Sequence, residues 1–408
     1  MATQPKVLVF AFDLLAHYTR CLRVAELLSN EYEFLFQSSD YDAVVHQQGF
    51  STFNCLRLAE KELVAQGCQE DIMNWPGADL ELVMLAQSEA IQQYQPVFVI
   101  GDMSPTLRMA TERTGVKYIS ITNAYLSRYY DAPFEAPDFL KKLGADVADV
   151  PPFYRNKLSD MKGFMAVSRS QKEFRFLRRR YGLAKQLNLA LELEGDQTWI
   201  CDTKLFHPLK DNLPKDIEEI GPLRFSPKGL KEKDQVNVHP DRKTILVTMG
   251  SSGNYAWLQQ LADQRFADYD FLVCGSTTEE NLPENIRYFQ FADFNKLMPQ
   301  VDLVICHGGN GSLYQALAAG KPIICFPGFF EQLFNAERIE ENGWGASYPE
   351  GTSTEDLLAA IETWVGRSLL PIAETIAKME ETQSNLLRKL TSHLLASISE
   401  TELSETVA

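Results

Sequence analysis

The 408-residue chain lacks any apolar run that approaches the ~18 residues needed to cross a membrane. Its N-terminal apolar run, residues 7–12, is short and ends at Asp13, which is not the pattern of a signal peptide. Cations are scarce as well: 39 Lys and Arg stand against 55 Asp and Glu, a net charge of −16. That balance argues against general nucleic-acid binding. We therefore expect a cytoplasmic protein with no nucleic acid among its partners.

Three chemical patterns are also missing. The seven cysteines form no Cys-x-x-Cys pair and several lie in apolar runs, which favours buried free thiols in a reducing compartment. The turn after the first apolar run has no Gly-x-Gly-x-x-Gly, so a dinucleotide-dependent dehydrogenase is not expected. Asp-x-Asp pairs occur at residues 40–42 and 268–270, but the second abuts an expected strand. We predict no metal requirement and no cofactor.

The most informative segment runs from Val301 to Gly345. It begins with a buried strand at 301–306, continues with the turn HGGNGS and a helical pattern, and reaches a second strand at 323–326. A glycine turn after a strand is by itself common. Here it places backbone N–H groups at a helix N-terminus, which favours a bound phosphate, and His307 and Ser312 can add side-chain donors. We interpret the turn as a diphosphate-binding site.

The letters HGGNGSLYQALAAGKP, followed by PGFFEQLFNA, resemble the donor-site signature of nucleotide-sugar-dependent glycosyltransferases with the GT-B fold. The pattern is most similar to the family of bacterial macrolide glycosyltransferases and UDP-glucuronosyltransferases. The resemblance implies an α/β chain of GT-B type, with two Rossmann-like domains whose parallel sheets face each other across a cleft. We expect an acceptor-binding domain at 1–225, a linker at 226–242, a donor-binding domain at 243–385, and a helix end with a polar tail at 386–408.

The resemblance assigns donor binding to residues of the second half. They comprise two glycine turns, an aromatic residue stacked on the base and an acid–glutamine pair for the sugar hydroxyls: Gly250, Ser251, Phe291, His307, Gly309, Asn310, Gly311, Ser312, Gln315, Glu331 and Gln332. One position departs from the family pattern, because Gln315 stands where a glutamate usually holds the ribose. The choice between a UDP-sugar and a dTDP-sugar stays open.

Two residues of the first half match the family's catalytic pair. We expect His17 in a loop between a strand at 6–12 and a helix at 20–30, where a neutral imidazole can take the proton of an acceptor hydroxyl. Asp102 follows a strand at 97–100 and would orient the imidazole ring. By composition alone, His17 could equally be a surface histidine and Asp102 a turn or helix-capping residue.

An aromatic segment after Thr122 corresponds to the family's acceptor pocket. Tyr125, Tyr129 and Phe134 are the expected apolar wall, although ordinary packing of a helical insertion explains them equally well. The one dense basic stretch, KEFRFLRRR at 172–180, fits either a solvated helix face or contact with an anionic membrane. The expected partners are thus a nucleotide-sugar donor, a small-molecule or lipid acceptor, and possible peripheral contact with a membrane.

The resemblance implies an inverting glycosyltransferase that moves a sugar from a UDP- or dTDP-sugar to a hydroxyl of a small, apolar acceptor. Two alternatives stay open at this point: a non-catalytic partner protein of the same fold, and a UDP-sugar epimerase. The sequence indicates neither the sugar, nor the acceptor, nor the oligomeric state.

Overall fold

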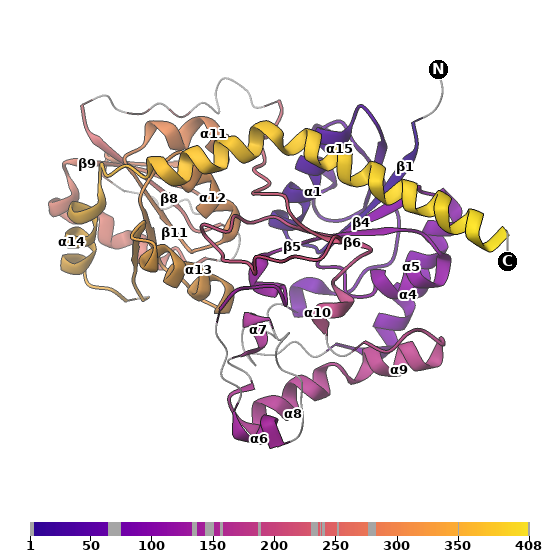
Figure 1. Cartoon of the computed structure of the whole chain (residues 1–408). Coiled ribbons are helices and arrows are strands. Elements are labelled where there is room, and N and C mark those ends of the chain that lie inside the picture. The colour runs from indigo at the N-terminus through magenta and orange to yellow at the C-terminus, as the bar shows by residue number, and fades with distance from the viewer. Residues whose placement is uncertain are drawn as a thin grey trace. The chain divides into compact units, whose positions relative to one another are not determined.

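The computed structural model describes residues 4–63, 75–132, 137–142, 151–155, 158–186, 189–229, 236, 238, 241–250, 253–275, 283–349 and 351–406. The chain divides into two compact units (Figure 1). The N-terminal unit comprises Met1–Gly221 and Thr382–Ala408, and the C-terminal unit comprises Pro222–Glu381. The division therefore falls a few residues ahead of the linker expected at 226–242.

The N-terminal unit is built on a seven-stranded sheet in which every pairing is parallel. In spatial order its strands are β3 (Ser51–Phe53), β2 (Glu33–Gln37), β1 (Lys6–Ala11), β4 (Phe98–Asp102), β5 (Tyr118–Thr122), β6 (Gln197–Ile200) and β7 (Ile217–Glu219). The order reverses direction between β1 and β4. This is the doubly wound arrangement, in which the crevice at the reversal point binds ligands.

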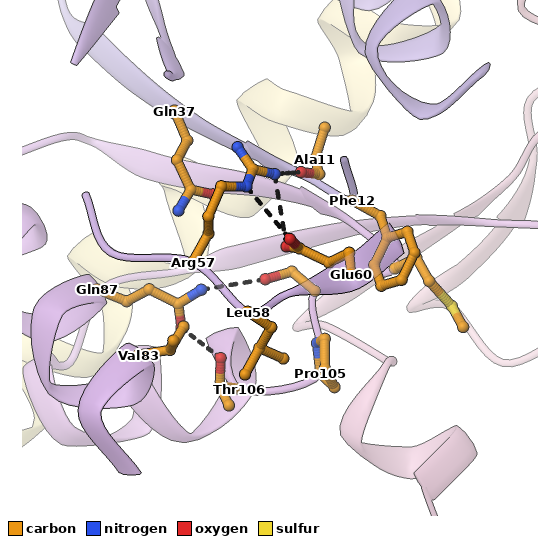
Figure 2. Close-up of a pocket in the computed structure, with 12 residues that line it drawn as sticks. Ala11, Phe12, Gln37, Arg57, Leu58, Glu60, Val83, Gln87, Pro105 and Thr106 are labelled. Atoms are coloured by element: carbon orange, nitrogen blue, oxygen red, sulfur yellow. Dashed lines mark hydrogen bonds and ion pairs between the residues drawn. The ribbon is translucent and has the colours of Figure 1, made fainter. Parts of the chain in front are cut away.

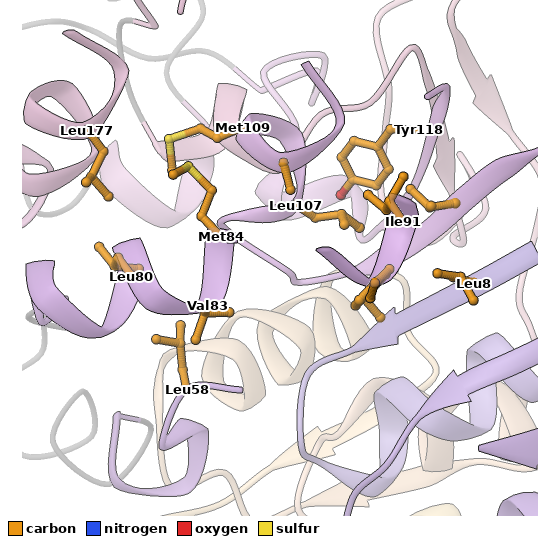
Figure 3. Packing of buried hydrophobic residues seen from close by; sticks show 14 of the residues in the cluster. Leu8, Leu58, Leu80, Val83, Met84, Ile91, Leu107, Met109, Tyr118 and Leu177 are labelled. Atoms are coloured by element: carbon orange, nitrogen blue, oxygen red, sulfur yellow. The ribbon is translucent and has the colours of Figure 1, made fainter. Parts of the chain in front are cut away.

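Helices cover this sheet because its strands are buried on both faces. The main helices are α1 (Leu15–Leu28), α2 (Asp42–Gln47), α4 (Gly77–Tyr94), α5 (Leu107–Thr114), α8 (Met161–Ser170) and α9 (Lys172–Arg180). Shorter ones are η1 (Ala124–Leu126), α6 (Asp138–Lys142), α7 (Pro152–Arg155) and α10 (Leu189–Glu192). Figure 3 shows one core of the unit, where Met84 of α4, Met109 of α5 and Leu177 of α9 pack together beyond the sheet residues Leu8 and Tyr118.

The C-terminal unit repeats the design with six parallel strands. Their spatial order is β10 (Ile286–Phe289), β9 (Tyr269–Cys274), β8 (Lys243–Thr248), β11 (Leu303–Cys306), β12 (Ile323–Cys325) and β13 (Gly345–Ser347). The order reverses between β8 and β11. The helical segments are η4 (Ala256–Ala262), η5 (Gln264–Phe266), α11 (Phe294–Leu297), η6 (Met298–Gln300), α12 (Asn310–Ala318), α13 (Phe330–Glu341), α14 (Thr354–Trp364) and the first part of α15 (Leu370–Thr406).

The predicted fold class, two Rossmann-like parallel-sheet domains, is confirmed by these two sheets. Three local expectations were wrong. Helix α1 begins at Leu15 rather than near residue 20, so His17 lies in a helix and not in a loop. The run at 198–201 predicts the last strand of the first half, but β7 follows β6 in the same sheet. The segment at 386–408, expected to be a helix end with a polar tail, is helical to Thr406.

Candidate functional site

In the N-terminal unit, the candidate site lies at the point where the strand order reverses. Ala11, the last residue of β1, pairs in register with Asp102, the last residue of β4. The backbone N–H of Phe12 donates to the Asp102 carbonyl at 3.0 Å, which extends the pairing by one residue. Only three residues, 12–14, separate β1 from α1, so the first turn of that helix lies directly above Asp102.

His17 and Asp102 meet at this point although 85 residues separate them in the chain. Nδ1 of His17 lies 2.7 Å from Oδ1 of Asp102. The Asp102 side chain is 1% exposed and the imidazole 17% exposed. When Nδ1–H donates to the carboxylate, the lone pair of Nε2 is left to accept a proton. The predicted pair is therefore assembled, and its geometry suits an imidazole base held by a buried acid.

A third charged residue, Arg20, joins the pair. Its Nη2 lies 2.7 Å from Oδ1 of Asp102 and 2.8 Å from Nδ1 of His17. Its Nη1 donates to Oδ1 of Asn123 at 2.6 Å and to Sγ of Cys201 at 3.2 Å. The sequence analysis missed Arg20 because it placed His17 in a loop. In a helix, residues three apart share a face, and that spacing was the available signal.

The residue after Asp102 has an unusual backbone. Met103 has φ = 56°, one of two positive values among the described non-glycine residues. Left-handed backbone at a side chain with a Cβ is costly and occurs where the surrounding structure enforces it, often at functional sites. Here the turn redirects the chain from β4 into the segment that leads to α5, and it leaves Asp102 pointing at His17.

A small pocket adjoins the same strand ends (Figure 2). Its lining includes Ala11 at the end of β1, Phe12 just after it, Met103 after β4, and the charged pair Arg57 and Glu60. Arg57 donates to the Ala11 carbonyl at 2.7 Å and forms an ion pair with Glu60. Burial is the main influence on Glu60 and raises the pKa of its carboxyl group, and Arg57 opposes that shift. The pocket therefore has a polar wall that sequence reasoning did not identify.

The three residues expected to form an apolar acceptor wall have different environments. Tyr125, in η1, is 4% exposed and its ring lies 6.0 Å from that of His207. Tyr129 is partly exposed and carries the guanidinium of Arg128 over its ring at 4.9 Å. Phe134 lies outside the described residues. The role of these residues in acceptor binding stays a prediction.

In the C-terminal unit, the predicted phosphate turn lies at the equivalent reversal point, after β11. Gly308 has φ = 86°, and a Cβ there would lie 2.8 Å from the Gln332 carbonyl oxygen. Gly309 is the N-cap of α12, and no side chain caps this end. An α-helix leaves its first N–H groups without partners inside the helix. A Cβ at Gly311 would meet nothing within 4 Å, so space for an anion lies beside this helix end.

His307 packs between the two glycine turns that follow β8 and β11. A Cβ at Gly250 would lie 2.6 Å from its Cε1, and one at Gly309 would lie 2.3 Å from its Nε2. The imidazole is 8% exposed. Burial lowers its pKa to about 4, and a hydrogen bond to the Thr248 backbone opposes this shift only in part. His307 is therefore neutral at pH 7, and a diphosphate bound at this turn would meet a dipole or a hydrogen-bond donor there rather than a cation.

The remaining donor candidates surround this turn or lie close to it in sequence. Gln332 is buried, and its Oε1 accepts from the Gly328 N–H at 2.8 Å. Glu331 precedes it in the first turn of α13 and is partly exposed. Nε2 of Gln315 lies 3.4 Å from the Phe225 carbonyl. Phe291, expected to stack on the base, is 44% exposed.

Three further donor candidates complete the set. Asn310 and Ser312 lie in the first turn of α12, and both are partly exposed. Ser251 lies outside the described residues. The binding roles of all these residues stay predictions.

Metal-binding and membrane-spanning features were searched across the described residues. No group of three His, Cys, Asp or Glu side chains there could hold a metal ion. Three carboxylates of the Asp-x-Asp pairs have protein partners: Asp40 pairs with Lys61, Asp42 accepts from Ser38, and Asp270 pairs with Arg287. In the same part of the chain, no helix is long and apolar enough to cross a bilayer.

The described thiols fit the expectation from their spacing. Six of the seven cysteines are described, none of them is in a disulfide, and five are buried. Burial raises the pKa of the Cys201 thiol, which lies beside Arg20, to about 12.

Comparison with known proteins places these features in a class. The fold is that of GT-B glycosyltransferases: the structure matches the calicheamicin glycosyltransferase CalG4 with a TM-score of 0.69 and 17% identity, covering 97% of this chain and 99% of that one. It also matches the spinosyn rhamnosyltransferase SpnG complexed with thymidine diphosphate, with a TM-score of 0.66 and 14% identity over 95% of this chain and 100% of that one. SpnG has also been solved with spinosyn aglycone.

The sequence comparisons agree with that class. Residues 274–385 match the model of the erythromycin biosynthesis protein CIII-like C-terminal domain. The chain is 28% identical over 266 residues to a PGL/p-HBAD biosynthesis rhamnosyltransferase of Mycobacterium bovis (strain BCG / Pasteur 1173P2), a match that covers 64% of this chain and 58% of that relative. The resemblance drawn from the sequence is thus confirmed: this is a GT-B-fold chain similar to the macrolide glycosyltransferases.

Proposed function

We propose that the protein is an inverting, metal-independent glycosyltransferase that uses a nucleotide-sugar donor. The observation that carries this proposal is the His17–Asp102 pair, with its 2.7 Å contact at the carboxyl ends of β1 and β4. Nucleotide binding alone does not require an imidazole held by a buried carboxylate, whereas deprotonation of an acceptor hydroxyl does. The names of the matched proteins, which are glycosyltransferases, support the same reaction class.

The proposed reaction uses the His17–Asp102 pair of the N-terminal unit and the start of α12 in the C-terminal unit. An acceptor hydroxyl is a poor nucleophile until it loses its proton, and Nε2 of His17 is the group suited to take it. Asp102 holds the ring and stabilises the imidazolium that forms. The hydroxyl oxygen then bonds to the anomeric carbon as the bond to the diphosphate oxygen breaks, with inversion. The N–H groups at the start of α12 stabilise the charge that develops on the leaving diphosphate.

For the donor, we propose a dTDP-sugar ahead of a UDP-sugar. Gln315 offers a neutral amide at the position where the related family usually has a glutamate for the ribose, and an amide suits a deoxyribose that has one hydroxyl fewer. SpnG, which shares the fold, is complexed with thymidine diphosphate, and the matched mycobacterial relative is named as a rhamnosyltransferase. A direct comparison of nucleotides is the first test of this choice.

For the acceptor, we propose a small molecule that carries a hydroxyl on an apolar or aromatic body. The pocket beside Asp102 combines apolar residues, such as Phe12 and Leu58, with the Arg57–Glu60 pair. An apolar body with a polar group near the reacting hydroxyl fits such a lining.

Thermal denaturation in the presence of UDP, dTDP, GDP and their sugars tests the donor site. A ligand that binds only the folded state at 100 times its Kd stabilises the protein by about 2.7 kcal/mol. We expect dTDP species to raise the melting temperature most and GDP not to raise it. The His17→Ala variant should keep this shift and lose transfer activity. A protein that no nucleotide stabilises would contradict the donor site and favour the non-catalytic alternative.

Treatment with EDTA tests metal independence. We expect full transfer activity after chelation, because the helix end and the glycine turns supply the positive potential that a divalent ion supplies in other transferases. Loss of activity in EDTA that manganese restores would refute this part of the proposal.

A further inference from the structure

The outer side of helices α8 and α9 carries an ordered row of exposed residues. The two helices follow one another along one edge of the N-terminal unit (Figure 1). Only Gln171 separates them, and its backbone angles, φ −95° and ψ −1°, are right-handed helical. The helical spacing therefore continues from one helix into the next with little interruption.

The exposed residues on this side recur every three or four positions, which puts them on one face. Three are large and apolar and three are cations: two methionines come first, followed by two cations, a phenylalanine and a third cation. We call this set the α8–α9 stripe: Met161, Met165, Arg169, Lys172, Phe176 and Arg179. Met161, Met165 and Phe176 are 45%, 55% and 54% exposed, and they account for three of the nine exposed large apolar residues of the described chain. Single exposed apolar residues are normal, but a periodic set on one face is not.

The opposite side of the two helices fixes them to the unit. Phe174 packs edge-on against Trp75, with ring centroids 5.7 Å apart, and Leu177 belongs to the same buried cluster. Arg178, whose side chain is 2% exposed, forms ion pairs with Glu112 and Glu192. Arg175 donates to the Ser168 carbonyl and thereby ties α9 to α8. The helices that carry the stripe are therefore held in place by packing and ion pairs on their opposite side.

The charge of the stripe is opposite to that of the chain. Residues 161–181 contain seven Lys and Arg and one carboxylate, whereas the whole chain has a net charge of −16. Arg169, Lys172 and Arg179 form no ion pair or side-chain hydrogen bond within the described residues. At an ionic strength of 0.1 M, charges farther away than about 10 Å are screened, so a surface approaching the stripe meets a local positive potential.

We propose that the α8–α9 stripe docks the N-terminal unit onto an anionic membrane surface. The cations meet lipid phosphates, and the two methionines and Phe176 enter the boundary between headgroups and acyl chains. Nucleic acid is a poorer fit, because methionine offers nothing to a phosphate backbone and the stripe has one aromatic ring for stacking. An acidic protein would satisfy the cations but would not require three exposed apolar residues on the same face. This inference is independent of the proposed transfer reaction.

Co-sedimentation of the full chain with vesicles tests the proposal. We expect binding to vesicles that contain phosphatidylglycerol, little binding to pure phosphatidylcholine, and loss of binding at high salt. Neutralising one cation near an anionic surface lowers partitioning about fivefold, so R169Q/K172Q/R179Q should bind about a hundredfold more weakly. M161S/M165S/F176S should also bind weakly, because it retains the charges but loses the apolar insertion.

A matched control separates the stripe from general charge effects. The exposed cations Lys204, Lys215 and Arg242 lie elsewhere on the chain, and K204Q/K215Q/R242Q should bind vesicles like the wild type. Unchanged circular dichroism and melting temperature establish that each variant is folded. The proposal would be overturned if the wild type did not bind vesicles, or if the control variant lost binding as much as the stripe variants. It would also be overturned if the protein bound a polyanion such as heparin but not vesicles.

Discussion

Replacing Arg20 by methionine should alter the pH dependence of catalysis without removing His17 or Asp102. The guanidinium lies 2.7 Å from the Asp102 carboxylate and 2.8 Å from Nδ1 of His17, so it faces both members of the pair. Other ionisable neighbours are the thiols of Cys21 and Cys201 and the phenol of Tyr118, whose pKa values are raised by burial. These groups are neutral near pH 7, which leaves Arg20 as the charge that balances Asp102.

The magnitude follows from the burial of Asp102, which is 1% exposed. Unit charges about 4 Å apart interact by about 4 kcal/mol at an effective dielectric constant of 20. Without Arg20, the Asp102 carboxylate has no cation beside it, and it therefore stabilises the protonated form of His17 more strongly. At about 1.4 kcal/mol for each pH unit, we expect the acidic limb of the kcat/KM profile to move upward by one to two units. At pH values on the acidic limb, activity should fall by about 10- to 100-fold, the factor that one to two pH units correspond to, and it should recover at alkaline pH.

The assay compares pH–rate profiles and urea unfolding for Arg20→Met, Arg20→Lys and the control Arg23→Met. Arg23 lies on the same helix, is 29% exposed and pairs with Glu26 at 3.6 Å, so its loss should change neither measurement by much. Lysine should restore part of the wild-type profile because it keeps the charge but not the planar fork. A profile for Arg20→Met that coincides with the wild type, at reduced stability, would show that Arg20 is only structural.

Three further outcomes follow from packing and burial. Gly309→Ala should lower stability by about 1–3 kcal/mol, because its Cβ would lie 2.3 Å from Nε2 of His307. A Cβ at Gly311 would meet nothing within 4 Å, so Gly311→Ala should leave urea unfolding unchanged and reduce only the nucleotide-induced thermal shift. Because burial lowers the pKa of His307 to about 4, the unfolded chain binds its proton first as the pH falls. Stability should therefore decline by about 3 kcal/mol between pH 6.5 and 4, and His307→Gln should flatten this slope in unfolding curves measured across that range. Arg178→Met should lower the free energy of unfolding in urea by about 3–5 kcal/mol, because it leaves the carboxylates of Glu112 and Glu192 without their partner. Arg180 is exposed and pairs with Glu81, so Arg180→Met should cost less than about 1 kcal/mol. Equal losses for the two variants would contradict this difference.

Most strands could be predicted from the sequence because both sheets are fully parallel and buried. Short continuous apolar runs such as residues 7–11 and 303–306 are typical of buried parallel strands. Of the described three-residue strands, β12 was predicted and the other three were not. β3, β7 and β13 lie at sheet edges, where a few backbone hydrogen bonds suffice and no long apolar run is needed.

Only the site residues that match motifs of the resembling family were predicted from the sequence. His17 and Asp102 were identified from the resemblance, but their contact depends on the register between β1 and β4, which no local pattern encodes. Arg20 was missed because the start of its helix was predicted too late. Helix α1 begins at Leu15 without a side-chain cap, so no capping residue marks this start in the sequence. Arg57 contacts Tyr18, Ser38 and Ala11 through the tertiary fold, and nothing in its local sequence indicates this.

The packing of His307 between two glycines constrains the order in which this turn can evolve. Gly309 has an ordinary φ of −71°, so the histidine ring, rather than the backbone, excludes a larger residue there. Once His307 is replaced by a smaller side chain, alanine at 309 becomes acceptable, and the histidine cannot then return without a clash. Gly250, with φ = 56°, stays restricted in either case. A chain that has lost the histidine can therefore accept alanine at 309, and that alanine would then prevent the histidine from returning.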